Sequence, residues 1–338
     1  MNKSPSKPVT IRKLPAASLP SGEIARRHVT LRQLEIFEAV ARLGSFTRAA
    51  QALHLTQPSV SMQVKTLAQS VGHTLFDQIG RNIALTAQGR ALFDMCREFD
   101  ALWSRFEAQV DGVSALRHGH LRVSVVTTAK YFLPRALGLF CRQHPGIEVE
   151  LEVQNRDGVL ARLRENRDDF HIMSMPPADL AIEAEPFLDN PLALLAPPDF
   201  KAPRQPYGLA DLAAERFLLR EPGSGTRMAL DQYLARKRVR LQRRMTLGSN
   251  EAIKQAVAGG LGIAVLSHHA LTRADLDEVQ LLSARDFPLA GVWHIVHWQG
   301  KQLSPAAEAF RQFLREFAAS HKVALSAQSK RRIRTAGS

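Results

Sequence analysis

The sequence predicts an α/β protein of 338 residues with a small, mostly helical N-terminal domain. Two observations indicate this fold class. Apolar residues recur at helical spacing in three short segments between residues 31 and 71, and a hairpin pattern follows them. From residue 120 onwards, short apolar runs alternate with helical patterns, which is typical of a parallel or mixed sheet covered by helices on both faces. The length is sufficient for two or three domains, each with its own core.

The N-terminal segments predict three short helices joined by tight turns. Thr30 is a suitable cap for the first helix and Gly44 a suitable end. The second helix is expected over Phe46–Leu53, and the third begins near Gln57. Three short helices in such close succession are typical of a helix-turn-helix.

The segment after the third helix predicts a wing. Residues 75–85 form two short strand patterns around a Gly-Arg-Asn tip. A hairpin with an arginine at its tip can place a cation in a minor groove of DNA. We therefore expect a winged helix-turn-helix domain over residues 29–89.

The third helix has two different faces. Val60, Val64 and Leu67 lie on one side of the helical wheel together with Val71. The opposite face contains no acidic residue, and its serine, glutamine and lysine side chains can donate to phosphates and base edges. The alternative is an ordinary amphipathic helix whose polar side faces water. Four residues of this opposite face are Pro58, Ser61, Met62 and Lys65.

A long helix is expected next, over residues 87–116, with a linker domain at residues 90–117. Its apolar residues follow steps of three and four, which is the repeat of a coiled coil. Such a seam predicts dimerisation through a second copy, although packing of the helix on its own domain is the alternative. The seam consists of Leu92, Met95, Phe99, Leu102, Phe106 and Val110.

Residues 118–320 predict two α/β lobes with the fold of periplasmic solute-binding proteins. Lobe 1 is expected over residues 118–191 and 293–320, and lobe 2 over residues 192–292. Expected helices include those over Lys130–His144 and Gly158–Asn166, after Thr226, over Glu251–Ala258 and over Ser304–Ala319. Expected strands are Leu121–Thr127, Ile147–Val153, Phe170–Ser174, Leu192–Ala196, Phe217–Leu219, Met245–Leu247, Gly262–Leu266 and Val292–Trp298.

Polar residues at the ends of these strands predict a binding site for a small molecule. In open α/β sheets, ligands collect at the carboxyl ends of strands, where helix N-termini offer free N–H groups to anions. Lys130, Arg156 and Arg220 could pair there with a phosphate or a carboxylate. The alternative is that the serine and threonine side chains only cap their own helices. The candidate residues are Thr127, Thr128, Lys130, Asn155, Arg156, Arg220, Ser224, Thr226, Ser249 and Asn250.

Motifs for catalysis or metal binding are missing from the sequence, so we expect neither an enzyme nor a bound cofactor. Phosphate-loop, HExxH and nucleophile-elbow patterns do not occur. Residues 259–262 form a Gly-Gly-Leu-Gly segment, but it ends a helix and starts a strand, which is the reverse of a dinucleotide fingerprint. The adjacent pair His268 and His269 diverges on a helix and does not have metal-ligand spacing.

Charge and hydropathy indicate a cytoplasmic protein. The net charge is +13, but residues 1–29 and 321–338 contribute ten of these charges, and we expect disordered basic tails at residues 1–28 and 321–338. Such tails would add a salt-dependent affinity for phosphate. No apolar run reaches the roughly 18–20 residues that span a bilayer, and no secretory signal precedes the domains. Cys96 and Cys141 are expected to be buried free thiols.

The stretch that begins at Thr30 resembles the DNA-binding domain of the LysR-type transcriptional regulators, through SFTRAA, LTQPSVS and LF followed by LTxxG. The resemblance implies base-proximal roles for Gln57, Pro58 and Ser61 and a minor-groove role for Arg81. Met62 stands where many members have an arginine, so methyl packing on thymine would replace a guanine contact. The expected DNA-contacting residues are Arg32, Thr47, Gln57, Pro58, Ser59, Ser61, Met62, Lys65, Arg81 and Asn82.

The second half of the chain is similar to the LysR branch that controls the Calvin-cycle operon encoding RuBisCO. The segments that carry this similarity are VVTTAKYFLPRALGLFCRQHPGIEVELEV, EPFLDNPLALLAPPD, REPGSGTR and GSNEAIKQAVAGGLGIAVLS. It implies control of carbon-fixation genes, promoter DNA as the partner and a small effector, such as a phosphorylated metabolite or NADPH. It also implies a homodimer or homotetramer that can contact RNA polymerase. A LysR-type regulator of another operon and a non-enzymatic solute-binding protein remain the alternatives.

Overall fold

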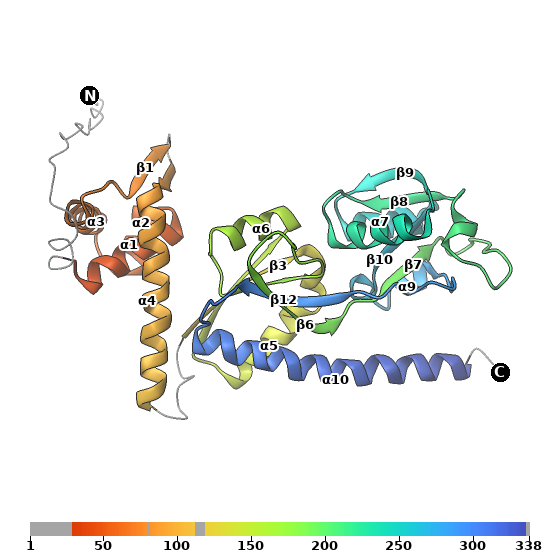
Figure 1. Ribbon diagram of the computed structural model, residues 1–338. Coiled ribbons are helices and arrows are strands. Elements are labelled where there is room, and N and C mark those ends of the chain that lie inside the picture. Colours follow the sequence, from red (N-terminus) through yellow and green to blue (C-terminus); the bar gives the residue numbers. More distant parts are fainter. Residues whose placement is uncertain (1–28, 80–81, 112–118, 336–338) are drawn as a thin grey trace, which may run out of the picture. The chain divides into compact units, whose positions relative to one another are not determined.

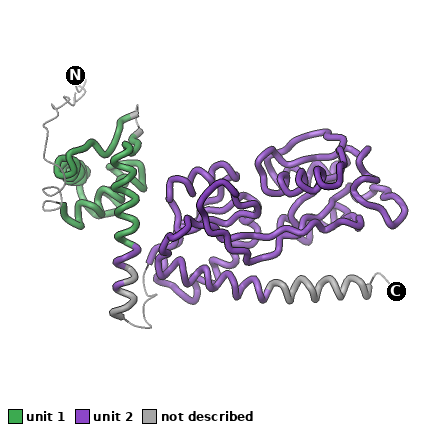
Figure 2. The backbone as a smooth tube through the Cα atoms, in the orientation of Figure 1, with its two compact units in different colours: residues 1–100 green, residues 101–338 purple. Residues whose placement is uncertain are grey.

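The computed structural model describes residues 29–79, 82–111 and 119–335. The chain divides into two compact units, residues 1–100 and 101–338 (Figure 2), and each unit has its own hydrophobic core. The expected tail at residues 1–28 lies outside the described residues.

The described part of the first unit contains three short helices, a two-stranded hairpin and the start of the longer helix α4 (Ala87–Asp111). Each short helix begins after a residue whose side chain accepts a hydrogen bond from the first turn, namely Thr30, Ser45 and Thr56. Ala49 and Ala50 are buried, and their small side chains allow the helices to approach closely. The prediction of a winged helix-turn-helix is confirmed. Its elements are α1 (Leu31–Leu43), α2 (Phe46–Ala52), α3 (Gln57–Val71), β1 (Phe76–Ile79) and β2 (Asn82–Leu85).

The LTxxG segment connects the hairpin to the long helix α4 (Ala87–Asp111). The hydroxyl group of Thr86 donates to the carbonyl of Thr74 at 2.7 Å, and it accepts a hydrogen bond from Gly89 N at 2.9 Å. A Cβ atom on Gly89 would lie 2.0 Å from the backbone oxygen of Leu75. The glycine is therefore needed because the backbone of α4 touches the backbone that precedes the hairpin.

The start of α4 belongs to the core of the first unit. Phe93 and Cys96 are buried and pack in one cluster with Phe37, Leu67 and Leu75. The linker that the sequence placed at residues 90–117 thus begins inside the N-terminal unit. The expected end of this helix near residue 116 lies beyond Asp111, outside the described residues.

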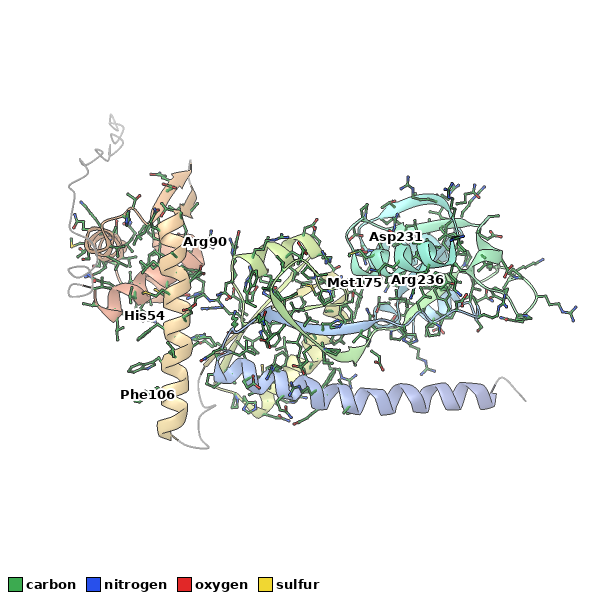
Figure 3. The ribbon with its side chains drawn as sticks, viewed as in Figure 1. His54, Arg90, Phe106, Met175, Asp231 and Arg236 are labelled. Atoms are coloured by element: carbon green, nitrogen blue, oxygen red, sulfur yellow. The ribbon has the colours of Figure 1, made fainter. Side chains whose placement is uncertain are left out.

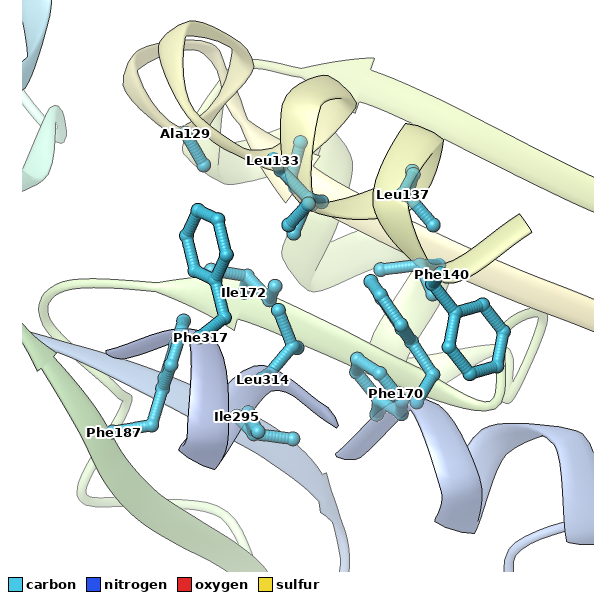
Figure 4. Close-up of a cluster of buried hydrophobic side chains, with 14 of the residues drawn as sticks. Ala129, Leu133, Leu137, Phe140, Phe170, Ile172, Phe187, Ile295, Leu314 and Phe317 are labelled. Atoms are coloured by element: carbon cyan, nitrogen blue, oxygen red, sulfur yellow. The ribbon is translucent and has the colours of Figure 1, made fainter. Parts of the chain in front are cut away.

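The second unit consists of two lobes, each built on a five-stranded mixed sheet (Figure 1). In lobe 1 the strand order is β4-β3-β5-β12-β6. One face packs on α5 and α10 through the cluster in Figure 4, and the other packs on α6. The elements of lobe 1 are β3 (Gly119–Val126), η3 (Thr127–Tyr131), α5 (Leu133–Gln143), β4 (Ile147–Gln154), α6 (Arg156–Arg164), β5 (Phe170–Met173), β6 (Ile182–Asp189), β12 (Val292–Trp298) and α10 (Pro305–Thr335).

Lobe 2 has the strand order β11-β7-β10-β8-β9, with α7 on one face and α8 on the other. Its elements are β7 (Leu192–Ala196), η4 (Leu209–Leu212), β8 (Arg216–Arg220), α7 (Gly225–Lys237), β9 (Gln242–Leu247), α8 (Asn250–Ala258), β10 (Ile263–Ser267), η5 (His268–Ala270), α9 (Asp275–Glu278) and β11 (Gln280–Leu281). The predicted two-lobed α/β fold is confirmed.

The chain crosses between the lobes twice, and the two crossing segments are bonded to each other. Asn190 N donates to the carbonyl of Gly291 at 2.8 Å. The buried side-chain oxygen of Asn190 accepts a hydrogen bond from Ser267 Oγ at 2.6 Å. A Cβ atom on Gly291 would lie 2.5 Å from the Asn190 carbonyl oxygen, so the two segments approach to backbone contact.

Several features of the second unit differ from the sequence expectation, and three of them have a clear physical reason. The helix expected from Lys130 starts only at Leu133, because Pro134 fits the first turn of a helix but not its interior. The strand β6 was not expected; it contains Pro186 and lies at the edge of the sheet, where proline is tolerated. Finally, α10 continues to Thr335, through residues expected to be a disordered tail. Alanine, lysine, arginine and glutamine favour helix in that stretch.

A buried polar cluster connects α6 to the sheet of lobe 1. The guanidinium group of Arg162 donates to both carboxylate oxygens of Asp168, at 2.6 and 2.9 Å, and only 1% of Asp168 is exposed. Burial raises the pKa of Asp168, but the hydrogen bonds from Arg162 and the nearby His171 outweigh burial and lower the pKa below its ordinary value of 3.8. Asp168 is therefore a carboxylate at neutral pH.

We expect Gly89→Ala to destabilise the first unit by about 2 kcal/mol or more, because a clash with backbone atoms cannot be relieved by a side-chain rotation. Thermal unfolding of the full chain, followed by circular dichroism, measures this effect. Gly138→Ala in α5 is the control, since nothing lies within 4 Å of its added Cβ, and it should raise stability slightly. Unchanged unfolding of Gly89→Ala would contradict the assigned contact.

We expect Asp168→Asn to lower the free energy of unfolding of the second unit by about 3 kcal/mol at pH 7, because it leaves the Arg162 charge without its partner. A carboxylate whose pKa is lowered by folding stabilises the fold at pH values above its pKa in the unfolded chain. The difference in unfolding free energy between Asp168→Asn and the wild type should therefore shrink as the pH falls below 3.8. Urea unfolding followed by tryptophan fluorescence measures both effects. Asp199→Asn, at an exposed aspartate in a loop, serves as the control. A pH-independent difference would argue against the ion pair.

Candidate functional site

The first candidate surface is the exposed face of α3. Val60, Val64 and Leu67 are buried in the core of the first unit. The predicted contact residues on the opposite face are all exposed, and this helix contains no acidic residue. Polar side chains, a cation and the positive end of the helix dipole thus face away from the core. The exposed residues are Gln57, Pro58, Ser59, Ser61, Met62 and Lys65, with Met62 at 66% exposure.

Two further expected DNA contacts lie in the first turns of neighbouring helices. Arg32 in α1 is exposed and pairs with Glu35 at 2.6 Å. Thr47 in α2 is also exposed. Arg81 lies outside the described residues, whereas the backbone of Asn82 begins β2. The position of the wing's arginine therefore stays a prediction.

The second candidate surface is an apolar stripe on α4. Met95, Leu102 and Phe106 are between 46% and 56% exposed, and Figure 3 shows Phe106 projecting from the helix. Trp103, which the sequence analysis did not include in the seam, is 48% exposed, and its ring lies 5.6 Å from that of Phe106.

The remaining seam residues are placed differently. Leu92 packs partly against the core of the first unit, so it does not belong to the exposed stripe. Phe99 is half-buried. The side chain of Val110 lies outside the part of the chain that is described.

The third candidate site lies where lobe 1 meets lobe 2. The hydroxyl group of Thr128, in η3 directly after β3, accepts a hydrogen bond at 3.3 Å from the amide of Asn250, at the start of α8. The amide oxygen of Asn250 accepts from Arg220, which also donates to Glu221 at 2.8 Å. These three side chains are buried, so they form a continuous polar connection between the lobes. Thr127, next to Thr128, is half-buried.

The N-terminus of α7 touches lobe 1 at a neighbouring position. A Cβ atom on Gly225 would lie 2.3 Å from Ser174 Oγ, and Met175 is also within van der Waals distance. The carbonyl of Met175, labelled in Figure 3, accepts a hydrogen bond from Arg156 at 2.8 Å. The guanidinium of Arg156 and the start of α7 therefore both contact the segment that contains Ser174 and Met175.

Arg156 is the least satisfied cation of this site. Its Nε atom is buried and has no hydrogen-bond partner, and it forms no ion pair with any described residue. Burial lowers its pKa from the ordinary arginine value, and the nearby carboxylates of Asp157 and Asp179 only partly offset this effect. Ser224 and Thr226, at the start of α7, are buried beside this position, and the first turn of α7 contains no acidic residue. This combination favours an anion.

Three of the expected effector contacts cap their own helices. The side-chain oxygens of Asn155, Ser224 and Ser249 accept from backbone N–H groups at 2.9, 3.1 and 3.3 Å. These hydrogen bonds agree with the alternative in which the side chains cap their own helices. Lys130, at the end of η3, pairs with Glu251 across the lobes.

Sequence reasoning missed Tyr131, Ser174, Met175 and Glu251, all of which lie at this boundary. Glu251 carried one signal, since it is an acid in the first turn of a helix that begins at a predicted ligand position. The others carried none, because their partners lie far away in the sequence.

A buried trio of Ser124, His171 and Asp168 resembles a hydrolase triad in composition only. Ser124 Oγ lies 2.6 Å from His171 Nδ1, and Asp168 Oδ2 lies 3.6 Å from the same nitrogen. A catalytic relay needs the serine and the aspartate on opposite ring nitrogens. Ser124 is also fully buried, which indicates a structural role.

Among the described residues, no three histidine, cysteine or acidic side chains are grouped so as to hold a metal ion. Within the same residues, no helix has the length and hydropathy needed to cross a membrane.

Comparison with known proteins gives matches along both units. Residues 31–90 match the family model of the bacterial regulatory helix-turn-helix proteins of the lysR family. Residues 114–319 match the model of the LysR substrate binding domain.

Curated relatives match over most of their length. The chain is 46% identical over 300 residues to a RuBisCO operon transcriptional regulator of Acidithiobacillus ferrooxidans, covering 87% of this chain and 95% of the relative. It is 40% identical over 290 residues to the HTH-type transcriptional activator CmpR of Synechocystis, covering 85% of this chain and 96% of the relative.

Solved structures of several proteins are similar to the chain. The regulatory domain of Synechocystis CcmR in complex with 2-PG has a TM-score of 0.56 and 42% identity, covering 60% of this chain and 98% of that domain. Full-length OxyR from Pseudomonas aeruginosa, at 21% identity and a TM-score of 0.69, covers 86% of this chain and 94% of that structure, and shows the shared fold. With both units matched, the chain belongs to the LysR family of bacterial transcriptional regulators.

Proposed function

We propose that this LysR-family protein binds promoter DNA through α3, assembles as a homodimer or homotetramer, and changes its DNA binding when a small anion binds between its lobes. The observation that carries the DNA proposal is the exposed face of α3, which holds Gln57, Ser61 and Lys65 and no acidic residue. Side chains of this kind donate to phosphates and to base edges in a major groove.

The target genes that we propose are those of carbon fixation. The support is the 46% identity to a RuBisCO operon regulator over 87% of this chain, and the similarity to CmpR over 85%. Regulators of this type need no catalytic step, so we propose a non-enzymatic protein that works with double-stranded DNA and with RNA polymerase at the promoter.

The oligomer is proposed to form through the stripe on α4. Met95, Leu102, Trp103 and Phe106 expose large apolar surfaces that a second α4 would cover. Two copies related by symmetry present two α3 helices to two half-sites about 34–36 Å apart or multiples of this distance.

The effector is proposed to be a small phosphorylated or carboxylated metabolite. Arg156 forms no ion pair with any described residue, and the first turn of α7 contains no acidic residue. The related CcmR domain was solved with 2-PG, which supports a phosphorylated acid of that size. The phosphates of NADPH share the same chemistry, so the proposal rests on the phosphate group.

The proposed mechanism is a shift between populations of lobe arrangements. A ligand that binds one arrangement better than another favours that arrangement. It thereby also favours one relative placement of the two α3 helices of the dimer. A preference of about 1–3 kcal/mol would change operator affinity by roughly 5–150-fold.

We expect Gln57→Ala and Lys65→Ala to have different effects on DNA binding. Lys65→Ala should weaken binding to operator and random duplex about equally, because it removes a phosphate contact. Gln57→Ala should relax the preference for one base pair by roughly 1–3 kcal/mol. Shift assays on the upstream region of the carbon-fixation genes, with random duplex alongside, measure both. Lys201→Ala, in an exposed loop of lobe 2, is the control. Equal losses on both duplexes for Gln57→Ala would contradict its base-reading role.

We expect Arg156→Met to weaken binding of 2-phosphoglycolate by about ten-fold or more, because a charge-assisted hydrogen bond contributes roughly 1.5–3 kcal/mol. Isothermal titration of the full chain measures this affinity. Arg142→Met removes an exposed cation from the last turn of α5 and should leave the affinity unchanged. If both variants bind as the wild type does, the phosphate does not sit at Arg156.

A further inference from the structure

Three side chains meet across the boundary between the lobes, and only one of them, Lys130, is among the predicted effector contacts. Lys130 and Tyr131 belong to η3 in lobe 1, whereas Glu251 lies in the first turn of α8 in lobe 2. The Tyr131 hydroxyl donates to Glu251 Oε1. Lys130 Nζ lies 3.3 Å from Oε1 and 3.4 Å from Oε2 of the same carboxylate.

The electrostatics of this group favour a charged carboxylate at neutral pH. Burial raises the pKa of Glu251, but hydrogen bonds from Tyr131 and from its own backbone N–H, together with Lys130, lower the pKa to about 2. Lys130 Nζ lies 5.1 Å from the centre of the Tyr131 ring, which adds a cation–π contact. Lys254 also faces this ring, but its charge is paired with Asp275 at 2.9 Å. Lys130 is therefore the cation that pairs with Glu251.

Glu251 occupies a position that suits an anionic ligand. It follows Asn250, whose amide reaches Thr128 across the boundary, and its carboxylate lies at the N-terminus of α8. Helix N-termini with a nearby lysine attract phosphates and carboxylates. The protein therefore already holds a carboxylate of its own at this end of the boundary.

We propose that Lys130, Tyr131 and Glu251 form a clasp that holds the two lobes together without ligand, and that Glu251 competes with an anionic effector for the cations of the boundary. The competition rests on the proposed effector site, whereas the clasp does not. A ligand with a phosphate or carboxylate group would take over Lys130 and release Glu251. Opening or replacing the clasp would couple ligand binding to the arrangement of the lobes.

The clasp is tested on the ligand-free full chain by hydrogen exchange. Glu251→Gln removes the charge, and Tyr131→Phe removes the hydroxyl donor. Either variant should speed amide exchange in residues 127–131 and 249–254 by roughly two- to five-fold, as expected for a half-exposed ion pair. Glu215→Gln is the matched control, since this exposed glutamate of lobe 2 precedes β8 and lies outside the boundary. Unchanged exchange in both variants overturns the clasp.

The competition is tested by isothermal titration of the same proteins with 2-phosphoglycolate and with inorganic phosphate. Glu251→Gln should bind 2-phosphoglycolate roughly two- to five-fold more tightly than the wild type, because a like charge and a competing partner of Lys130 are removed. Equal or weaker binding overturns the competitor role even if exchange is faster. If the wild type binds neither anion, the proposed effector site fails and the competitor role fails with it, while the exchange rates still decide the clasp.

Discussion

The two crossings of the chain between the sheets are the constraint on which the sensor half depends. Asn190 and Gly291 bring these crossings into backbone contact, and Ser267 joins them from the end of β10. Since both crossings are short and bonded to each other, the lobes stay next to each other along this boundary. The polar residues at the carboxyl ends of β3 and β9 can therefore meet across the boundary, as Thr128 and Asn250 do.

The first unit depends on a similar backbone contact. Gly89 allows the start of α4 to lie against the backbone of Leu75, and Phe93 then fills the core behind α3. The buried side of α3 is held by this core, so its polar side is the one left to solvent. A rigid helix face of this kind is what a groove of DNA requires, because base contacts need a fixed register.

Much of the candidate site could be predicted from the sequence, since its signals are local. The polar side of α3 follows from helical spacing, and the strand ends with Thr128, Arg156 and Asn250 follow from the alternation of strands and helices. The clasp could not be predicted, because Tyr131 and Glu251 are 120 residues apart and nothing local to either residue indicates the other. The sequence did not decide whether Asn155, Ser224 and Ser249 cap their helices, and the hydrogen bonds of the structure showed that they do.

The sequence by itself determined most of the order of elements, the apolar side of each helix and most of the places where helices begin, because periodicity and capping act over a few residues. Tertiary structure decided which of these helix ends meet and which charges find a partner. It left Arg156 without an ion pair among the described residues, while Lys130 received one from the other lobe. The physical reason is that ion pairing and burial depend on distances in space, and chain crossings set those distances between residues that are remote in sequence.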